Sequence, residues 1–385
     1  MVYFFTIKVF SYRLKGKEQQ HKMAQKIEAY EWNKVVSEDR LMDDTIFTRT
    51  LEKETIELNQ LQADCLEQWL TPQELAILLK HSELIKFDAG ETLLRQGQKS
   101  EGIYIIIEGN VLVTARAMGQ GITNIETLGP GNFLAEISFI ETTRTPTSFI
   151  ASNQVLCLFI TNSYFDMLSF YFPETRYKIL QAISKQACNR LKRVHDKVTA
   201  LIRNSEMTSL SFYGKVVQSL NQPKQIPLPD NEIDNTPLQR APLFTAFTKE
   251  EIEELFEYSQ LLEAPKNCKL IHEGDKRASC YIVIHGAVQS SITHDNKLAK
   301  LSVIGPGTLF ASIACFNKDS PFTITFISCE QVVLFKIPEE KLHFLEKNRP
   351  QLWYKLFNLI CGSLMALEKS IDKLDIRLHI EVYNR

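Results

Sequence analysis

Two hydrophobic patterns alternate along the chain. Short runs of β-branched and aromatic residues, such as Ile103–Ile107 and Tyr281–Ile284, are bounded by glycine-bearing turns, which is typical of short antiparallel strands. Longer stretches carry an apolar residue every three or four positions, the period of an amphipathic helix. These stripes are Leu180, Ile183, Ala187, Leu191, Val194, Val198 and Leu201, and then Leu356, Ile360, Leu364, Leu367, Ile371, Leu374 and Leu378. The pattern predicts a set of strands followed by a long helix, twice.

The two halves of the chain repeat each other. Leu70–Leu79 aligns without gaps with Phe247–Phe256. The register continues through Gly97 with Gly274, Tyr104 with Tyr281, Gly109 with Gly286, and, after one deletion, Leu128-Gly-Pro-Gly131 with Ile304-Gly-Pro-Gly307. Thr71 and Thr248 each stand three positions before a glutamate, the capping-box spacing that starts a helix. A repeat of this kind indicates two domains of the same fold.

We therefore predict a mainly β fold with flanking helices, of the α+β class. It consists of two tandem double-stranded β-helix (jelly-roll) barrels, each with an N-terminal helix and a C-terminal helix. The predicted parts are a helical N-terminal extension over 1–64, a first domain over 65–203, a proline-containing linker over 204–240 and a second domain over 241–385. A chain of 385 residues exceeds what one hydrophobic core normally fills, which agrees with this division.

The stripe from Leu356 to Leu378 has two interpretations. Its three-four spacing fits a helix-pairing seam between two chains, which would make a homodimer through the C-terminal helix. It fits equally a helix that covers its own barrel, and the pattern does not choose between them.

Composition narrows the class of protein. With 44% hydrophobic residues, 23% charged residues and a formal net charge of −2, the chain has no overall electrostatic attraction to nucleic acid. No stretch is long and apolar enough to span a membrane, and the apolar Met1–Phe10 is interrupted by Lys8. The eight cysteines are scattered without a C-x-x-C pair, which predicts reduced thiols and a cytoplasmic location.

The sequence carries no familiar catalytic motif. G-x-S-x-G, H-E-x-x-H and G-x-x-x-x-G-K-[ST] are all missing, so we predict no catalytic residues and no enzyme activity. His272-Glu273 and the helix face from Cys188 to His195 lack completing ligands. We therefore predict no metal site and no cofactor.

One segment carries a family resemblance. After the first Gly-Pro-Gly turn comes Phe133-Leu-Ala-Glu-Ile-Ser-Phe-Ile140, which resembles the phosphate-binding cassette of cyclic-nucleotide-binding domains, as in the catabolite activator and the regulatory subunits of protein kinases. In that family the cassette reads roughly F-G-E-L-A and then P-R-x-A-T. Its glutamate binds the ribose 2′-hydroxyl and its arginine pairs with the cyclic phosphate. The resemblance covers most of 65–203 and 242–380.

The resemblance implies a ligand site in the first domain, with Glu136 at the ribose and Arg144 at the phosphate. The implied ligand-binding residues are Phe133, Ala135, Glu136, Ile137, Ser138, Arg144 and Thr145. Ala135 replaces the usual glycine, which would adopt a positive φ more easily. Arg144 stands eight positions after Glu136, one fewer than the commonest spacing, and lacks the preceding proline. The alternative is a surface ion pair between Glu136 and Arg144, of little energetic value.

The second domain lacks both charged groups of the cassette. The alignment places Ser312 at the glutamate position and Phe322 at the arginine position. A phosphate there would lose the charge-assisted hydrogen bonds that offset its desolvation. We interpret this domain as a pseudo-domain used for packing or for contact with an unidentified protein partner.

Three other regulatory classes fit less well. A transcription regulator needs a helix-turn-helix after the long helix, and only His379–Arg385 follow the second stripe. A kinase regulatory subunit would present an Arg-Arg-x-Ser or Arg-Arg-x-Ala segment ahead of the barrels, and this chain has none there. A channel would need apolar spans, which the sequence also lacks.

The chain is therefore interpreted as a cyclic-nucleotide-binding sensor whose first domain binds cyclic GMP or cyclic AMP. Thr145 slightly favours cyclic GMP, because family members that prefer guanine often carry threonine there, although a strand threonine explains it equally. The alternative function is a scaffold that binds no nucleotide and uses both barrels for protein contacts or dimerisation.

Overall fold

The computed structural model describes residues 66, 68–116, 121–203, 221–227, 241–272, 274–294, 297–316 and 324–383, all within one compact unit, Leu58–Arg385. Several predictions lie outside these residues. They concern the N-terminal extension over 1–64, most of the linker over 204–240, and Phe322.

The first barrel follows helix α3, which begins with a capping box. Thr71 caps α3 through the backbone N–H of Glu74, and the Glu74 carboxylate accepts from the N–H of Thr71. Two four-stranded antiparallel sheets form the barrel, in the orders β1-β8-β3-β6 and β2-β7-β4-β5. The bounds are α3 Pro72–Lys80, β1 Glu83–Phe87, β2 Thr92–Leu94, β3 Gly102–Glu108, β4 Val111–Arg116, β5 Ile122–Leu128, β6 Phe133–Leu134, β7 Ser148–Ala151 and β8 Val155–Thr161.

Three helices complete the first domain. The short α4 (Glu136–Glu141) lies between β6 and β7, where the sequence resembles the cassette. α5 (Asn162–Tyr171) and the long α6 (Pro173–Arg203) follow the last strand. The stripe predicted on α6 is buried, from Leu180 at 1% exposed to Val198 at 0%.

The second barrel repeats this plan. Its sheets have the orders β15-β12-β17-β10-β9 and β11-β16-β13-β14. A 3-10 turn, η3, stands where the first domain has α4. The bounds are β9 Lys224–Gln225, η2 Pro242–Phe244, α9 Lys249–Glu257, β10 Gln260–Ala264, β11 Lys269–Ile271, β12 Ser279–His285, β13 Val288–His294, β14 Lys297–Ile304, β15 Leu309–Ala311, η3 Ile313–Cys315, β16 Ile324–Ser328, β17 Val332–Pro338, α10 Glu339–Asn348 and α11 Pro350–Tyr383.

The sequence repeat corresponds to a repeat in backbone geometry. Thr248 caps α9 with the same capping box that Thr71 makes at α3. Gly109 and Gly286 have φ of 86° and 81°, values that a side chain disfavours. A Cβ at either position would also lie 2.2 or 2.5 Å from a backbone carbonyl oxygen of Gln154 or Gln331. The predicted fold class, two barrels with flanking helices, is confirmed.

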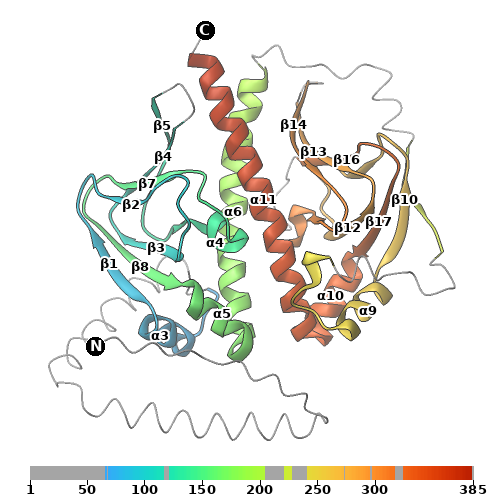
Figure 1. Cartoon of the computed structure of the whole chain (residues 1–385), viewed down its shortest axis with the longest axis horizontal. Helices are drawn as coiled ribbons and strands as arrows, with labels where there is room; N and C mark the ends of the chain where they lie inside the picture. Colours follow the sequence, from blue (N-terminus) through green and yellow to red (C-terminus); the bar gives the residue numbers. More distant parts are fainter. Residues whose placement is uncertain are drawn as a thin grey trace, which may run out of the picture. The chain divides into compact units, whose positions relative to one another are not determined.

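The apolar stripe of α11 packs against α6 of the same chain. The two helices lie side by side in Figure 1, and α11 also contacts α4 and β15. Leu356, Leu364 and Leu374 on this stripe are all 2% exposed or less. α11 thus packs against its own barrel, as one of the two sequence interpretations expected. It also packs against α6 of the first domain, which neither interpretation anticipated. Among the described residues, no helix is long and apolar enough to cross a membrane.

Candidate functional site

The cassette segment turns sharply just before α4. Ala135, which precedes the helix, has φ 67° and ψ 18°, in the left-handed region. Left-handed backbone costs a residue with a Cβ about 1–2 kcal/mol. The strain expected from alanine in place of glycine is therefore present, and the chain adopts the turn in spite of it.

A narrow hollow lies between this segment, the β2-β7-β4-β5 sheet and two helices. Its volume is about 390 Å³ with its open mouth, of which about 20 Å³ admits the centre of a water molecule. Five of the seven predicted site residues line it: Ala135, Glu136, Ile137, Ser138 and Thr145. Glu126 of β5, Arg190 of α6 and Asp372 of α11 also line it. The second domain thus contributes a wall of the first domain's hollow.

The other two predicted site residues lie elsewhere. Phe133 is 1% exposed in the core, and its N–H donates to the Gln186 side-chain oxygen at 2.8 Å. Arg144 is exposed, and its Nη1 donates to the backbone oxygen of Gly97 at 2.7 Å. The shortened loop accounts for this placement, because it pairs Arg144 with Lys99 in a β-bridge at the barrel surface.

Thr145 occupies the inward position next to Arg144. It stands nine positions after Glu136, the commonest spacing for the cassette arginine, and it is 2% exposed. Its hydroxyl donates to the backbone oxygen of Thr147 at 3.0 Å and so already has a partner.

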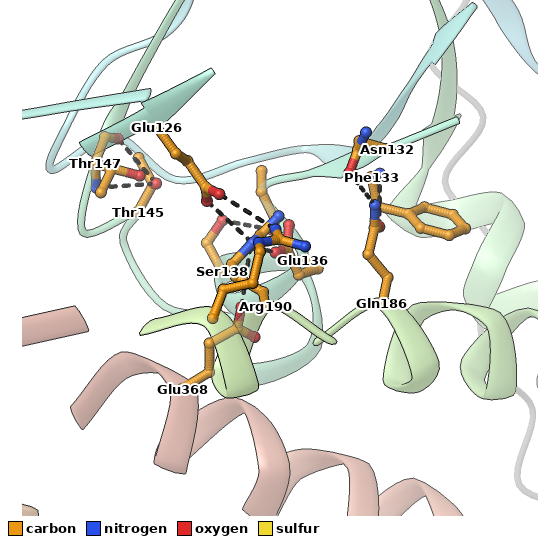
Figure 2. Close-up of polar contacts among 12 residues, drawn as sticks. Glu126, Asn132, Phe133, Glu136, Ser138, Thr145, Thr147, Gln186, Arg190 and Glu368 are labelled. Carbon is orange, nitrogen blue, oxygen red and sulfur yellow. Dashed lines mark hydrogen bonds and ion pairs between the residues drawn. The ribbon is translucent and has the colours of Figure 1, made fainter. Parts of the chain in front are cut away.

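Arg190 extends into the hollow from α6 and forms ion pairs with carboxylates of β5, α4 and α11 (Figure 2). Its Nη1 donates to Oε1 of Glu136 and, at 3.0 Å, to Oε1 of Glu368 on α11. Its Nε lies 3.1 Å from Oε1 of Glu126. The side chain is 8% exposed. The carboxylate expected to hold a ribose is therefore engaged by an arginine that also joins the first domain to the second.

The charges of this cluster are not balanced. Burial raises the pKa of Glu368 to about 8, although Arg190 acts in the opposite direction. Burial also raises the pKa of Asp372, and Arg190 again opposes the shift. One guanidinium shared among several carboxylates leaves part of the negative charge uncompensated, so protons are retained at neutral pH.

Sequence reasoning missed Arg190 and Glu368, although a signal was present. Arg190 stands three positions after Ala187 and four before Val194, inside the apolar stripe of α6. Glu368 lies between Leu364 and Ile371 in the same way. A charged residue within a buried helix face requires a partner of opposite charge, since an isolated buried charge is costly.

Aromatic rings fill the interior of the second barrel. Phe310 stacks between Tyr281 and Phe326, with ring centroids 5.0 and 4.9 Å apart. Ser312, at the glutamate position of the cassette, is 2% exposed, accepts from the N–H of Ser279 and donates to the Arg277 oxygen, both at 3.0 Å. Its hydroxyl is thus used within the protein.

Within the described ranges, no three His, Cys, Asp or Glu side chains are grouped so as to hold a metal ion.

Both barrels match the same family model. The family model for the cyclic nucleotide-binding domain matches residues 84–170 and 261–348. The cAMP-activated global transcriptional regulator CRP of Salmonella typhimurium is 26% identical over 166 residues, which are 42% of this chain and 74% of the relative. The CRP-like cAMP-activated global transcriptional regulator of Mycobacterium tuberculosis is 23% identical over 135 residues, 35% of this chain and 58% of the relative.

Solved structures show a distant likeness. The regulatory domain of Toxoplasma gondii PKA with cAMP has 11% sequence identity and a TM-score of 0.29, with 80% of this chain and 97% of that chain covered. A cyclic nucleotide-binding domain from Methylobacillus flagellatus has 19% identity and a TM-score of 0.35, with 38% and 82% covered.

Proposed function

We propose that this chain, which carries two cyclic nucleotide-binding domains, is a non-enzymatic regulatory protein. Its first domain binds a cyclic nucleotide, cyclic GMP or cyclic AMP, in the hollow beside α4. Its second domain is a pseudo-domain whose helix α11 closes that hollow. Binding of the nucleotide changes the contact between α6 and α11, which is the regulatory output.

The observation that carries this proposal is the position of Glu136. Glu136 is 3% exposed and lies at the start of α4, in a hollow between the barrel and α6. A buried carboxylate is costly unless it is paired, so it is retained where it serves a partner or a ligand. The resemblance of the segment to the phosphate-binding cassette supports a ribose hydroxyl as that ligand group.

The structure corresponds to a closed state in this proposal. Glu136 is held by Arg190, and Lys369 of α11 donates to Oε2 of Glu141, at the last residue of α4, at 2.6 Å. A ribose hydroxyl and Arg190 compete for the same carboxylate oxygens. A ligand shifts the equilibrium only because it binds the state in which Glu136 is released better than the closed state.

Two observations support the pseudo-domain. The second barrel's interior is occupied by the stacked rings of Tyr281, Phe310 and Phe326, and η3 replaces the α4 helix. The second domain nevertheless supplies Glu368, Lys369 and Asp372 to the first domain's site. The role of the second domain in this proposal is therefore to connect the first domain's site to α11.

Calorimetric titration of the purified chain with cyclic GMP and with cyclic AMP tests the proposal. We expect saturable binding of at least one of them. At a hundredfold excess over Kd, the native state gains about 2.7 kcal/mol, which a thermal melt detects. Glu136→Gln should weaken binding, whereas Ser312→Ala, its matched position in the second barrel, should not. Failure of both nucleotides to bind would contradict the proposal.

A second candidate function is a scaffold that binds no nucleotide. The observation in its favour is that Glu136 already has Arg190 as a partner and that Glu126 and Asp372 add negative charge to the hollow. In that case the cluster serves only to hold α6 against α11, and neither nucleotide changes the thermal melt.

A further inference from the structure

We infer that Arg190 of α6, rather than an arginine of the cassette, supplies the cation that contacts the phosphate of the ligand. This inference rests on the proposed function, because it assigns a residue to the phosphate of a nucleotide bound in the same hollow. It makes one guanidinium both the ligand contact and the link to the second domain.

Arg190 faces the hollow from α6. Among the described residues that line it, Arg190 is the only lysine or arginine, and it comes from α6. It shares the hollow with Ala135, Glu136, Ile137 and Ser138, the segment at which the family resemblance places the phosphate. A phosphate in this hollow therefore has Arg190 as its cationic neighbour.

Arg190 does not use all of its N–H donors in hydrogen bonds to the described residues. Its Nη2 is buried and has no hydrogen-bond partner among the described residues, although Nη1 serves both Glu136 and Glu368. The guanidinium is a fork of five N–H donors that suits two oxygens of one anion. A buried donor without a partner is unfavourable, and a ligand oxygen at Nη2 would remove that cost.

Arg144, the arginine of the cassette, does not line the hollow. Arg144 is exposed, donates to the Gly97 oxygen and is bridged to Lys99 across the barrel surface. Turning it inward would break this bridge and would expel Thr145, which is 2% exposed. The shortened loop thus moved the cation out of the cassette, and α6 provides a substitute.

The side chains that contact Arg190 in ion pairs are acidic. Glu126, Glu136, Glu368 and Asp372 surround Arg190, so an added anion would be repelled if every carboxylate stayed in place. Exchange of Glu368 for a phosphate oxygen removes one acidic side chain from the guanidinium and places the phosphate in its position. Because Glu368 belongs to α11, this exchange weakens the α6–α11 contact as the ligand binds.

The test compares cyclic nucleotides with the corresponding nucleosides, which lack the phosphate. Calorimetry is carried out with cyclic AMP, adenosine, cyclic GMP and guanosine on the full chain. The variants are Arg190→Gln, Arg190→Lys, which keeps the charge but loses the fork, and Arg144→Ala as the control. A thermal melt of each variant shows that it is folded.

We expect the wild type to bind a cyclic nucleotide more tightly than its nucleoside. Arg190→Gln should weaken cyclic nucleotide binding roughly ten- to a hundredfold, the range for a charge-assisted contact, and leave the nucleoside within about threefold. The affinity of Arg190→Lys for the cyclic nucleotide should lie between those of the wild type and Arg190→Gln. A purely structural role of Arg190 would instead lower the affinities for nucleotide and nucleoside together.

Other results separate the two proposals. If Arg144→Ala removes the preference for the phosphate and Arg190→Gln keeps it, the proposed function stands and the inference is overturned. Equal affinity of the wild type for nucleotide and nucleoside also overturns the inference. If the wild type binds neither cyclic nucleotide, the proposed function fails, and the assignment of Arg190 fails with it.

Discussion

Arg190 of α6 donates from Nη1 to Oε1 of Glu368 on α11 at 3.0 Å, across the contact between the two domains. The same nitrogen donates to Glu136 in the hollow of the first barrel. The guanidinium that would face the ligand is therefore joined by one hydrogen bond to α11, the helix that would respond to binding. Lys369, the next residue on α11, holds the end of α4 through Glu141, so the second domain contacts both sides of the site.

Stability should depend on pH through Glu368. Burial raises its pKa from 4.5 to about 8, so between these values the native state holds a proton that the unfolded chain has released. The contribution is fully present below about pH 4.5 and is lost as pH rises through about 8. Glu368→Gln imitates the protonated acid, so at pH 9 its free energy of unfolding should exceed the wild type's by more than about 1 kcal/mol, the value of a single pKa unit.

The control for this prediction is Glu253→Gln, on an exposed side chain of α9. Its melting temperature should follow the wild type's from pH 5 to pH 9. A Glu368→Gln protein with the wild-type pH dependence would show that Glu368 is ionised in the native state.

The leucine stripe of α11 should act within one chain. Leu367 and Leu374 are 5% and 2% exposed against the rest of the same chain. Leu367→Asp with Leu374→Asp places two carboxylates in this contact and should cost at least about 3 kcal/mol of stability. Lys373→Asp, at an exposed position on the same helix, should cost less than about 1 kcal/mol.

Light scattering and a denaturant melt measure both effects. A parent dimer that the double leucine variant converts to a folded monomer would contradict the intrachain assignment. That outcome would favour the homodimer interpretation of the stripe.

Ala135 should tolerate glycine better than other buried alanines do. Its φ of 67° is a strained value for alanine, so glycine there relieves strain while it loses a buried methyl group. Ala151 is equally buried, at 1% exposed in strand β7, and has no positive φ to relieve. Ala135→Gly should therefore be more stable than Ala151→Gly by about 1–2 kcal/mol in urea melts. Equal losses would indicate that the turn before α4 is unstrained.

The sequence predicted the barrels better than the site. Thr71 and Thr248 cap helices, and Gly109 and Gly286 adopt positive φ. Both requirements concern the backbone of a short segment, so they can be recognised from the local sequence. The direction of Arg144 depends on a one-residue difference in loop length that shifts it to the surface. Comparison with the family's spacing shows that the loop is shorter, but it does not predict where the side chain points. The contact of Arg190 with Glu368 joins residues 178 positions apart, and neither helix alone specifies its partner.

Hydrogen exchange of the full chain, with and without a saturating cyclic nucleotide, tests the central claim most directly. If the ligand exchanges with Glu368 at Arg190, amides of α6 between Pro173 and Arg203 should become more protected because Arg190 on this helix contacts the ligand. Amides of α11 around Glu368 and Asp372 should become less protected, because their contact with α6 weakens. The Glu136→Gln variant, which should bind more weakly, should show smaller changes in both helices at the same nucleotide concentration. Protection that increases in both helices, or exchange in α11 that does not change when the nucleotide is bound, would contradict the account.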